Sequence, residues 1–133
     1  MLFVYSAVAK ADSIVTMDEI LVHHRQAPGT LSVTREKSWH CFYDALVALR
    51  SQLKEWNLYE RFQQDYINYC VNFSLWHLNT LKEPTHTLLY NKLRDEWFDD
   101  LGVTAFPESY FYNNYEYKQY RLIYEFPLEE KIP

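Results

Sequence analysis

Four consecutive polar residues in the N-terminal quarter of the chain have the side-chain types best suited to chemistry: His23, His24, Arg25 and Gln26. The two histidines and the arginine end a β-prone run, residues 20–25. Gln26 begins the Pro-Gly loop that follows, which should stop the strand because proline lacks a backbone donor and glycine admits positive φ. A neutral histidine at a strand end can ligate a divalent metal, and an arginine can hold a diphosphate through two parallel hydrogen bonds. The alternative is that one histidine points into the core and the other is exposed.

The residues around this run carry a family resemblance, through the pattern Leu21-x-His23-His24-Arg25-Gln26 followed by Gly29-Thr30-Leu31-Ser32. The pattern resembles a segment late in the catalytic domain of family 2 glycosyltransferases, which reads as an apolar strand, one or two aromatics and an Arg, then a Gly-Ser-x-Ser-like loop. Residues 1–12 resemble the helix that follows the Glu-Asp pair of this family. The Tyr- and Trp-rich remainder is similar to the helical tail of bacterial members.

This resemblance implies a parent enzyme that transfers a sugar from a nucleotide-sugar to a surface-glycan acceptor, with Mg²⁺ or Mn²⁺. It implies that His24, Arg25, Gln26 and Thr30 lie on the acceptor and diphosphate side of the substrate site, and that His24 is a candidate metal ligand. The chain has neither the Asp-x-Asp metal motif nor the Glu-Asp pair of the family, and Asp99-Asp100 is expected to close a helix rather than a strand. We therefore expect a C-terminal portion that has no catalytic residues and no cofactor of its own and that works with the rest of the catalytic domain.

Two further groups of residues could do chemistry but have plainer interpretations. The first consists of His40, Cys41, Cys70 and His77. Zinc sites usually have tighter spacing, such as Cys-x-x-Cys, so buried core cysteines are the preferred interpretation. The second consists of Asp95, Glu96, Asp99 and Asp100. These acids share a helix that already has an apolar face, so a solvated surface is preferred over a general acid/base pair.

Composition excludes several classes of protein. The chain has 133 residues, a net charge of −5 and only two cysteines, which argues against nucleic-acid binding and against a disulfide framework. No apolar stretch is long enough to span a bilayer. With 12 Tyr and 4 Trp the chain could stack on sugars, but burial in the core or an interface is the stronger interpretation of each ring.

Helical spacing of apolar residues recurs along the chain and predicts helices over residues 2–11, 35–54, 57–82, 84–102 and 113–126. The expected N-caps are Thr34, Asn57 and Asn113, and the expected C-cap is Gly102. In the first helix Phe3, Ala7 and Val8 are expected to share a face. In the third, the spacing of the large rings predicts that Trp76 is buried.

The predicted fold is mainly α: a bundle of about four to five helices with a short N-terminal β-hairpin, residues 14–16 and 20–25. Residues 1–34 would be a remnant of the catalytic domain and residues 35–133 the helical C-terminal region, folded together as one compact domain. We expect a cytoplasmic protein, with attachment to the inner face of the membrane left open, and a homodimer if an apolar patch is exposed. The alternative is a free-standing helical module that binds other proteins and has no catalytic activity.

Overall fold

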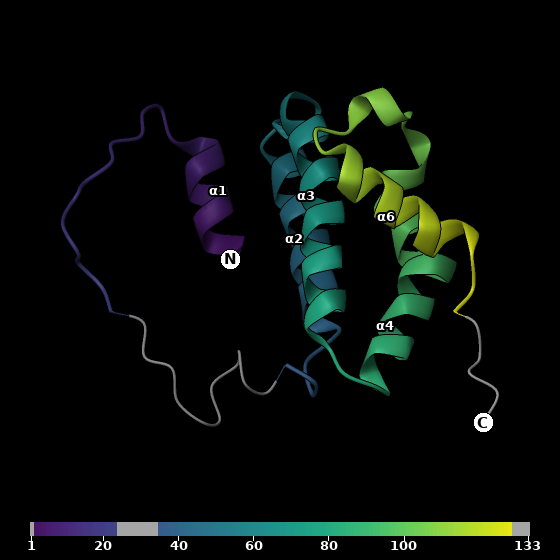
Figure 1. The fold of residues 1–133 in the computed structure, drawn as a ribbon. Helices are drawn as coiled ribbons and strands as arrows, with labels where there is room; N and C mark the ends of the chain where they lie inside the picture. The colour runs from purple at the N-terminus through teal and green to yellow at the C-terminus, as the bar shows by residue number, and fades with distance from the viewer. Residues whose placement is uncertain (1, 24–34, 129–133) are drawn as a thin grey trace.

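The computed structural model describes residues 2–23 and 35–128, and this part of the chain is mainly helical (Figure 1). The α-helices are α1 (Leu2–Lys10), α2 (Cys41–Glu55), α3 (Tyr59–Thr80), α4 (Thr85–Lys92), α5 (Phe98–Asp100) and α6 (Asn114–Glu125). A π-helix, η1 (Leu93–Trp97), joins α4 to α5, and the 3₁₀-helices η2 (Val103–Ala105) and η3 (Glu108–Tyr110) lead to α6. None of the described helices combines the length and apolarity needed to cross a membrane. The prediction of a mainly helical fold is confirmed.

The predicted β-hairpin is wrong for the residues that can be assessed. Residues 14–16 and 20–23 are extended but form no strand, and the rest of the second run lies outside the described residues. The side chains of Val15 and Val22 are 85% and 83% exposed. A two-stranded hairpin is at best marginally stable in water unless a third strand or a helix covers it. Here the segment extends away from the helices, so nothing stabilises the pairing (Figure 1).

Helices α2 and α3 form the centre of the fold, and the turn between them has a defined local cause. Asn57 has φ of 57°, in the left-handed region that asparagine tolerates better than most residues. The Leu58 amide donates to the Leu53 carbonyl at 2.8 Å and the Asn57 amide donates to Lys54 at 3.1 Å, the two bonds of a Schellman motif. Asn57 therefore ends α2, and the prediction that it caps α3 is wrong. The other predicted cap of this region, Thr34, lies outside the described residues.

The buried face of α3 differs from the expected one at Trp76. Its buried residues are Tyr66, Ile67, Cys70, Val71, Ser74, Leu75 and Leu78. Trp76 is 49% exposed, so its predicted burial is wrong. The ring lies at the edge of the core, with the Arg35 guanidinium 4.8 Å from its centroid. An amphipathic ring suits such an edge, where its body packs and its N–H stays near water.

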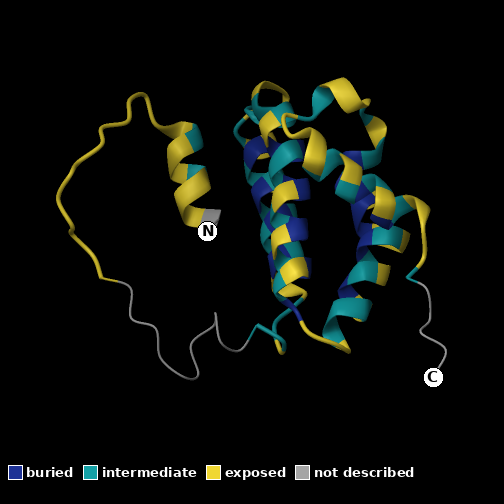
Figure 2. Ribbon diagram, viewed as in Figure 1, coloured by how far each residue is buried: buried dark blue, intermediate teal, exposed yellow. Residues whose placement is uncertain are grey.

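The C-terminal half follows its local sequence signals closely. Gly102 has φ of 83° at the end of α5, as a glycine C-cap requires. The Asn113 side chain accepts hydrogen bonds from the amides of Tyr115 and Glu116 at 3.0 and 3.2 Å, which caps α6. The core runs through this half as well, because Leu89, Leu93, Trp97 and Leu101 are all buried. Figure 2 shows the buried residues on the facing sides of α3, α4 and α6, whereas α1 is largely exposed.

Candidate functional site

The predicted substrate-site residues His24, Arg25, Gln26 and Thr30 all lie outside the described residues. Their role, and the role of His24 as a metal ligand, therefore remain predictions. The neighbouring His23 is described, and its side chain is exposed on the extended segment. No group of three or more potential metal ligands occurs within residues 2–23 and 35–128.

The extended segment that leads to these residues is an unusual surface. It carries six large apolar side chains that are 62–85% exposed: Ile14, Val15, Met17, Ile20, Leu21 and Val22. Within the described chain, the backbone groups of residues 12–23 form no hydrogen bonds with the helices. An apolar, β-prone run whose backbone groups lack hydrogen-bond partners is typical of a strand that adds to the edge of a sheet. Sequence reasoning identified the β-prone runs but expected them to pair with each other.

Helix α1 rests on a groove between α2 and α3, and three contacts hold it. The rings of Tyr5 and Tyr69 lie 4.7 Å apart, the Lys10 ammonium lies 4.4 Å from the Trp56 ring centre, and Ala9 packs against the core. Burial, followed by the hydrogen bond with Tyr5, raises the pKa of Tyr69. The expected face of α1 is wrong in part, since Phe3 is 84% exposed and Ala7 is also exposed. The spacing of Tyr5 and Ala9, four residues apart, was the sequence signal that could have identified the inner face.

His77 is the most perturbed histidine among the described residues. Its ring stacks on Phe42 at 4.3 Å with an interplanar angle of 10° and meets Phe73 edge-on at 4.5 Å. Neither ring nitrogen has a hydrogen-bond partner among the described residues, although both are buried. Burial, with the nearby Arg35 charge, lowers the pKa of His77 to about 4. His77 is therefore a neutral ring packed among aromatics.

The cysteines are not brought into a zinc site. Cys70 is fully buried, and burial raises the pKa of its thiol to about 12. Cys41 is exposed at the start of α2, and both cysteines are free. A thiol with a raised pKa is a poor nucleophile and a poor metal ligand at neutral pH. Cys70 therefore acts as a core residue.

The acidic run is engaged in structural contacts. Asp100 accepts a hydrogen bond from the Tyr43 hydroxyl, and Arg50 donates to its backbone carbonyl at 2.6 Å. Asp99 accepts hydrogen bonds from Thr104 at 2.7 Å and from Tyr124 at 3.2 Å. These bonds join α2, α5, η2 and α6 at the surface. The two other acids pair with basic residues that are close in sequence: Glu96 with Lys92 and Asp95 with Arg94. A general acid/base pair needs two carboxyl groups that face one pocket, and these four do not.

Comparisons with known protein families, with curated proteins and with solved structures find no match to this chain. Its function is therefore argued from its residues alone.

Proposed function

We propose that this chain is the helical, non-catalytic C-terminal part of a family 2 glycosyltransferase. The observation that carries the proposal is the exposed apolar run, residues 14–22, which leads into the segment that resembles this family and whose backbone has no hydrogen-bond partner among the described residues. In the parent enzyme this run pairs with a sheet of the catalytic domain. The enzyme transfers a sugar from a nucleotide-sugar to a surface-glycan acceptor in the cytoplasm or at the inner face of the membrane.

The energetic argument rests on what the run leaves in water. Side chains such as Val15 at 85% and Ile20 at 77% exposure gain about 1.5–3 kcal/mol each when they are buried. A segment that exposes such side chains, and whose backbone groups lack partners among the described residues, is stabilised when it adds to the edge of an existing sheet. The helical residues 35–128 already form a core without it. The partner of the run is therefore a sheet that these helices do not supply.

The polar residues that follow the run take their roles from the resemblance. Arg25 would hold the diphosphate of the nucleotide-sugar through two parallel hydrogen bonds, and His24 would ligate Mg²⁺ or Mn²⁺. Gln26 and Thr30 would line the acceptor side. The helices α2 to α6 would form an appendage beside this wall, and the catalytic base and the metal-binding Asp-x-Asp motif would come from the remainder of the enzyme.

The first experiment determines the reading frame upstream of the codon for Met1 and assays the longer protein. We expect an in-frame strand with an Asp-x-Asp motif and a Glu-Asp pair, and sugar transfer that depends on Mn²⁺. The 133-residue chain itself should bind neither uridine nor guanosine diphospho-sugars in calorimetry with Mn²⁺. An upstream stop codon with a separate ribosome-binding site, or micromolar binding of a nucleotide-sugar by this chain alone, would overturn the proposal.

The second candidate is a free-standing helical module that binds other proteins. The observation that favours it is the groove between α2 and α3, which holds α1 through apolar contacts, as helix-binding grooves do. Catalytic motifs encoded in frame upstream of Met1 would rule it out.

A further inference from the structure

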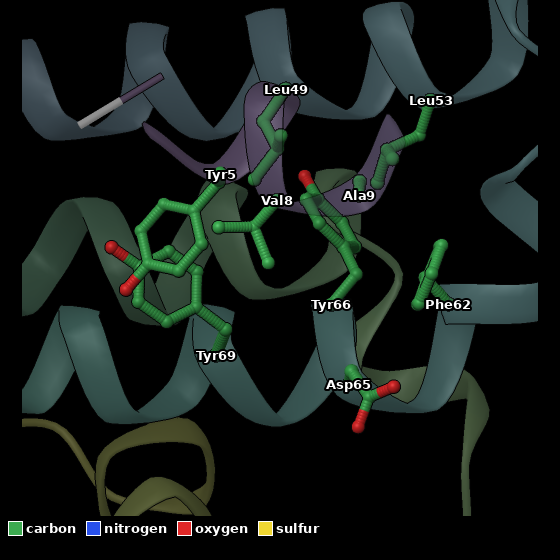
Figure 3. A pocket seen from close by; sticks show the side chains of 9 residues that line it. All are labelled: Tyr5, Val8, Ala9, Leu49, Leu53, Phe62, Asp65, Tyr66 and Tyr69. Carbon is green, nitrogen blue, oxygen red and sulfur yellow. The ribbon is translucent and has the colours of Figure 1, made fainter. Parts of the chain in front are cut away.

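An apolar cavity lies where α1 rests on α2 and α3 (Figure 3). Its volume is about 280 Å³, and its apolar walls are Val8 and Ala9 from α1, Leu49 and Leu53 from α2, and Phe62 from α3. For scale, an engineered apolar cavity of about 150 Å³ stays free of water and binds benzene. This cavity is therefore large enough for a ligand of more than one ring.

Aromatic rings border the cavity on the α1 and α3 sides. The rings of Tyr5 and Tyr69 lie 4.7 Å apart at an angle of 49°, and the Tyr66 ring also lines the space. Aromatic walls favour a flat aromatic ligand, because offset and edge-on ring pairs add to the gain from burial.

The polar groups around the cavity already have partners in the protein. The Tyr66 hydroxyl donates to the Leu46 carbonyl at 2.8 Å. The Asp65 carboxylate accepts a hydrogen bond from the Tyr112 hydroxyl at 2.8 Å. Among the described residues that line the cavity Asp65 is the only charged one, and its side chain is exposed at the edge of the cavity. A ligand thus needs no hydrogen bond here, and a negative charge on it would be repelled.

We propose that this cavity binds a small neutral aromatic molecule of about two to three rings. Helix α1 covers one side of the site through Tyr5, Val8 and Ala9. This proposal does not depend on the glycosyltransferase proposal.

The test uses two fluorescent probes that share a ring skeleton, the neutral N-phenyl-1-naphthylamine and the anionic 8-anilinonaphthalene-1-sulfonate. The 133-residue chain should bind the neutral probe saturably with one site, and the sulfonate more weakly. Asp65→Asn should reduce the difference in affinity between the two probes, because it removes the negative charge at the edge of the cavity.

Two matched pairs of variants locate the binding. Ala9→Leu fills the cavity and should weaken binding of the neutral probe by about tenfold or more, the equivalent of about two buried methylene groups. Ala7→Leu makes the same change at an exposed residue of α1 that does not line the cavity, and should leave binding unchanged. In the second pair, Val8→Phe changes a residue that lines the cavity and Val4→Phe is its control. Far-UV circular dichroism checks that all four variants are folded.

Weaker binding in Ala9→Leu and Val8→Phe, with their controls unaffected, would support the site. Absence of saturable binding, or equal binding by the cavity variants and their controls, would overturn it. The glycosyltransferase proposal is untouched by either result, since it is tested on the longer enzyme.

Discussion

Two tryptophans that look alike in sequence should differ sharply in what they contribute to stability. Trp97 is 7% exposed, and its ring stacks on Tyr43 at 4.3 Å and meets Phe42 edge-on at 5.8 Å. Trp76 is 49% exposed, and the Arg35 guanidinium lies 4.8 Å from the centroid of its ring. The substitutions Trp97→Ala and Trp76→Ala remove the same atoms, so the comparison isolates the environment of the ring.

Truncation of a buried tryptophan to alanine lowers the free energy of unfolding by about 3–5 kcal/mol. Because the Trp97 ring also contacts two other aromatic rings, we expect Trp97→Ala to fall in the upper part of that range. For Trp76 we expect about 1–2 kcal/mol, from roughly half the burial and one cation–π contact. Urea unfolding followed by far-UV circular dichroism measures both, because fluorescence changes when a tryptophan is removed. A loss in Trp76→Ala equal to that in Trp97→Ala would refute the position of the α3 face described above.

Three other predictions address single side chains. The Ser74 hydroxyl is buried and has no hydrogen-bond partner within the described residues, so Ser74→Ala should raise the free energy of unfolding by up to about 1 kcal/mol. Ser51→Ala, at an exposed helix position, is the control and should change it by less than about 0.5 kcal/mol. A lower free energy of unfolding in Ser74→Ala would contradict this prediction. Because the pKa of His77 is lowered from 6.5 to about 4, the folded state binds fewer protons than the unfolded state between these pH values, and stability should be full above pH 6.5 and fall as the pH drops toward 4. Unfolding free energies at several pH values should show this part of the fall in the wild type and not in His77→Phe, and equal slopes would refute the packing of His77. In the full-length glycosyltransferase that we propose, Arg25→Ala should reduce turnover on the order of 10²–10³-fold at an unchanged melting temperature, with partial recovery in Arg25→Lys. Unchanged turnover would show that Arg25 has no role in catalysis.

Local chemistry explains which parts of the fold could be predicted from sequence. Asn113 and Gly102 were identified correctly because their roles depend on a few adjacent residues, a side-chain acceptor for two amides and a φ of 83°. Asn57 carries two such signals, since it can cap the next helix or take a left-handed φ at the end of the previous one. In the structure Asn57 has the left-handed φ and ends α2. The packing of α2 on α3 decides between the two roles.

Tertiary context explains the rest. The hairpin over residues 14–25 was predicted from β-propensity, which depends on what covers the strand rather than on the strand alone. The error at Trp76 came from weighting ring size, whereas the aliphatic positions Ile67, Val71 and Leu75 define the buried face. The π-helix over Leu93–Trp97 has no pattern of its own in the sequence. The described residues include the apolar run that leads to the candidate site but not the predicted site residues themselves. The exposure of this run could not be inferred without the fold.

Amide hydrogen exchange of residues 14–22, compared between this chain and the proposed full-length enzyme, tests the central claim most directly. In the 133-residue chain these amides should exchange as fast as in an unfolded peptide, because their backbone groups have no partners among the described residues. In the longer protein the same amides should be protected in the alternating pattern of a sheet strand, while protection within α3 stays the same. Equally fast exchange in both proteins would show that the run does not join a sheet, and would contradict the assignment of this chain to a glycosyltransferase.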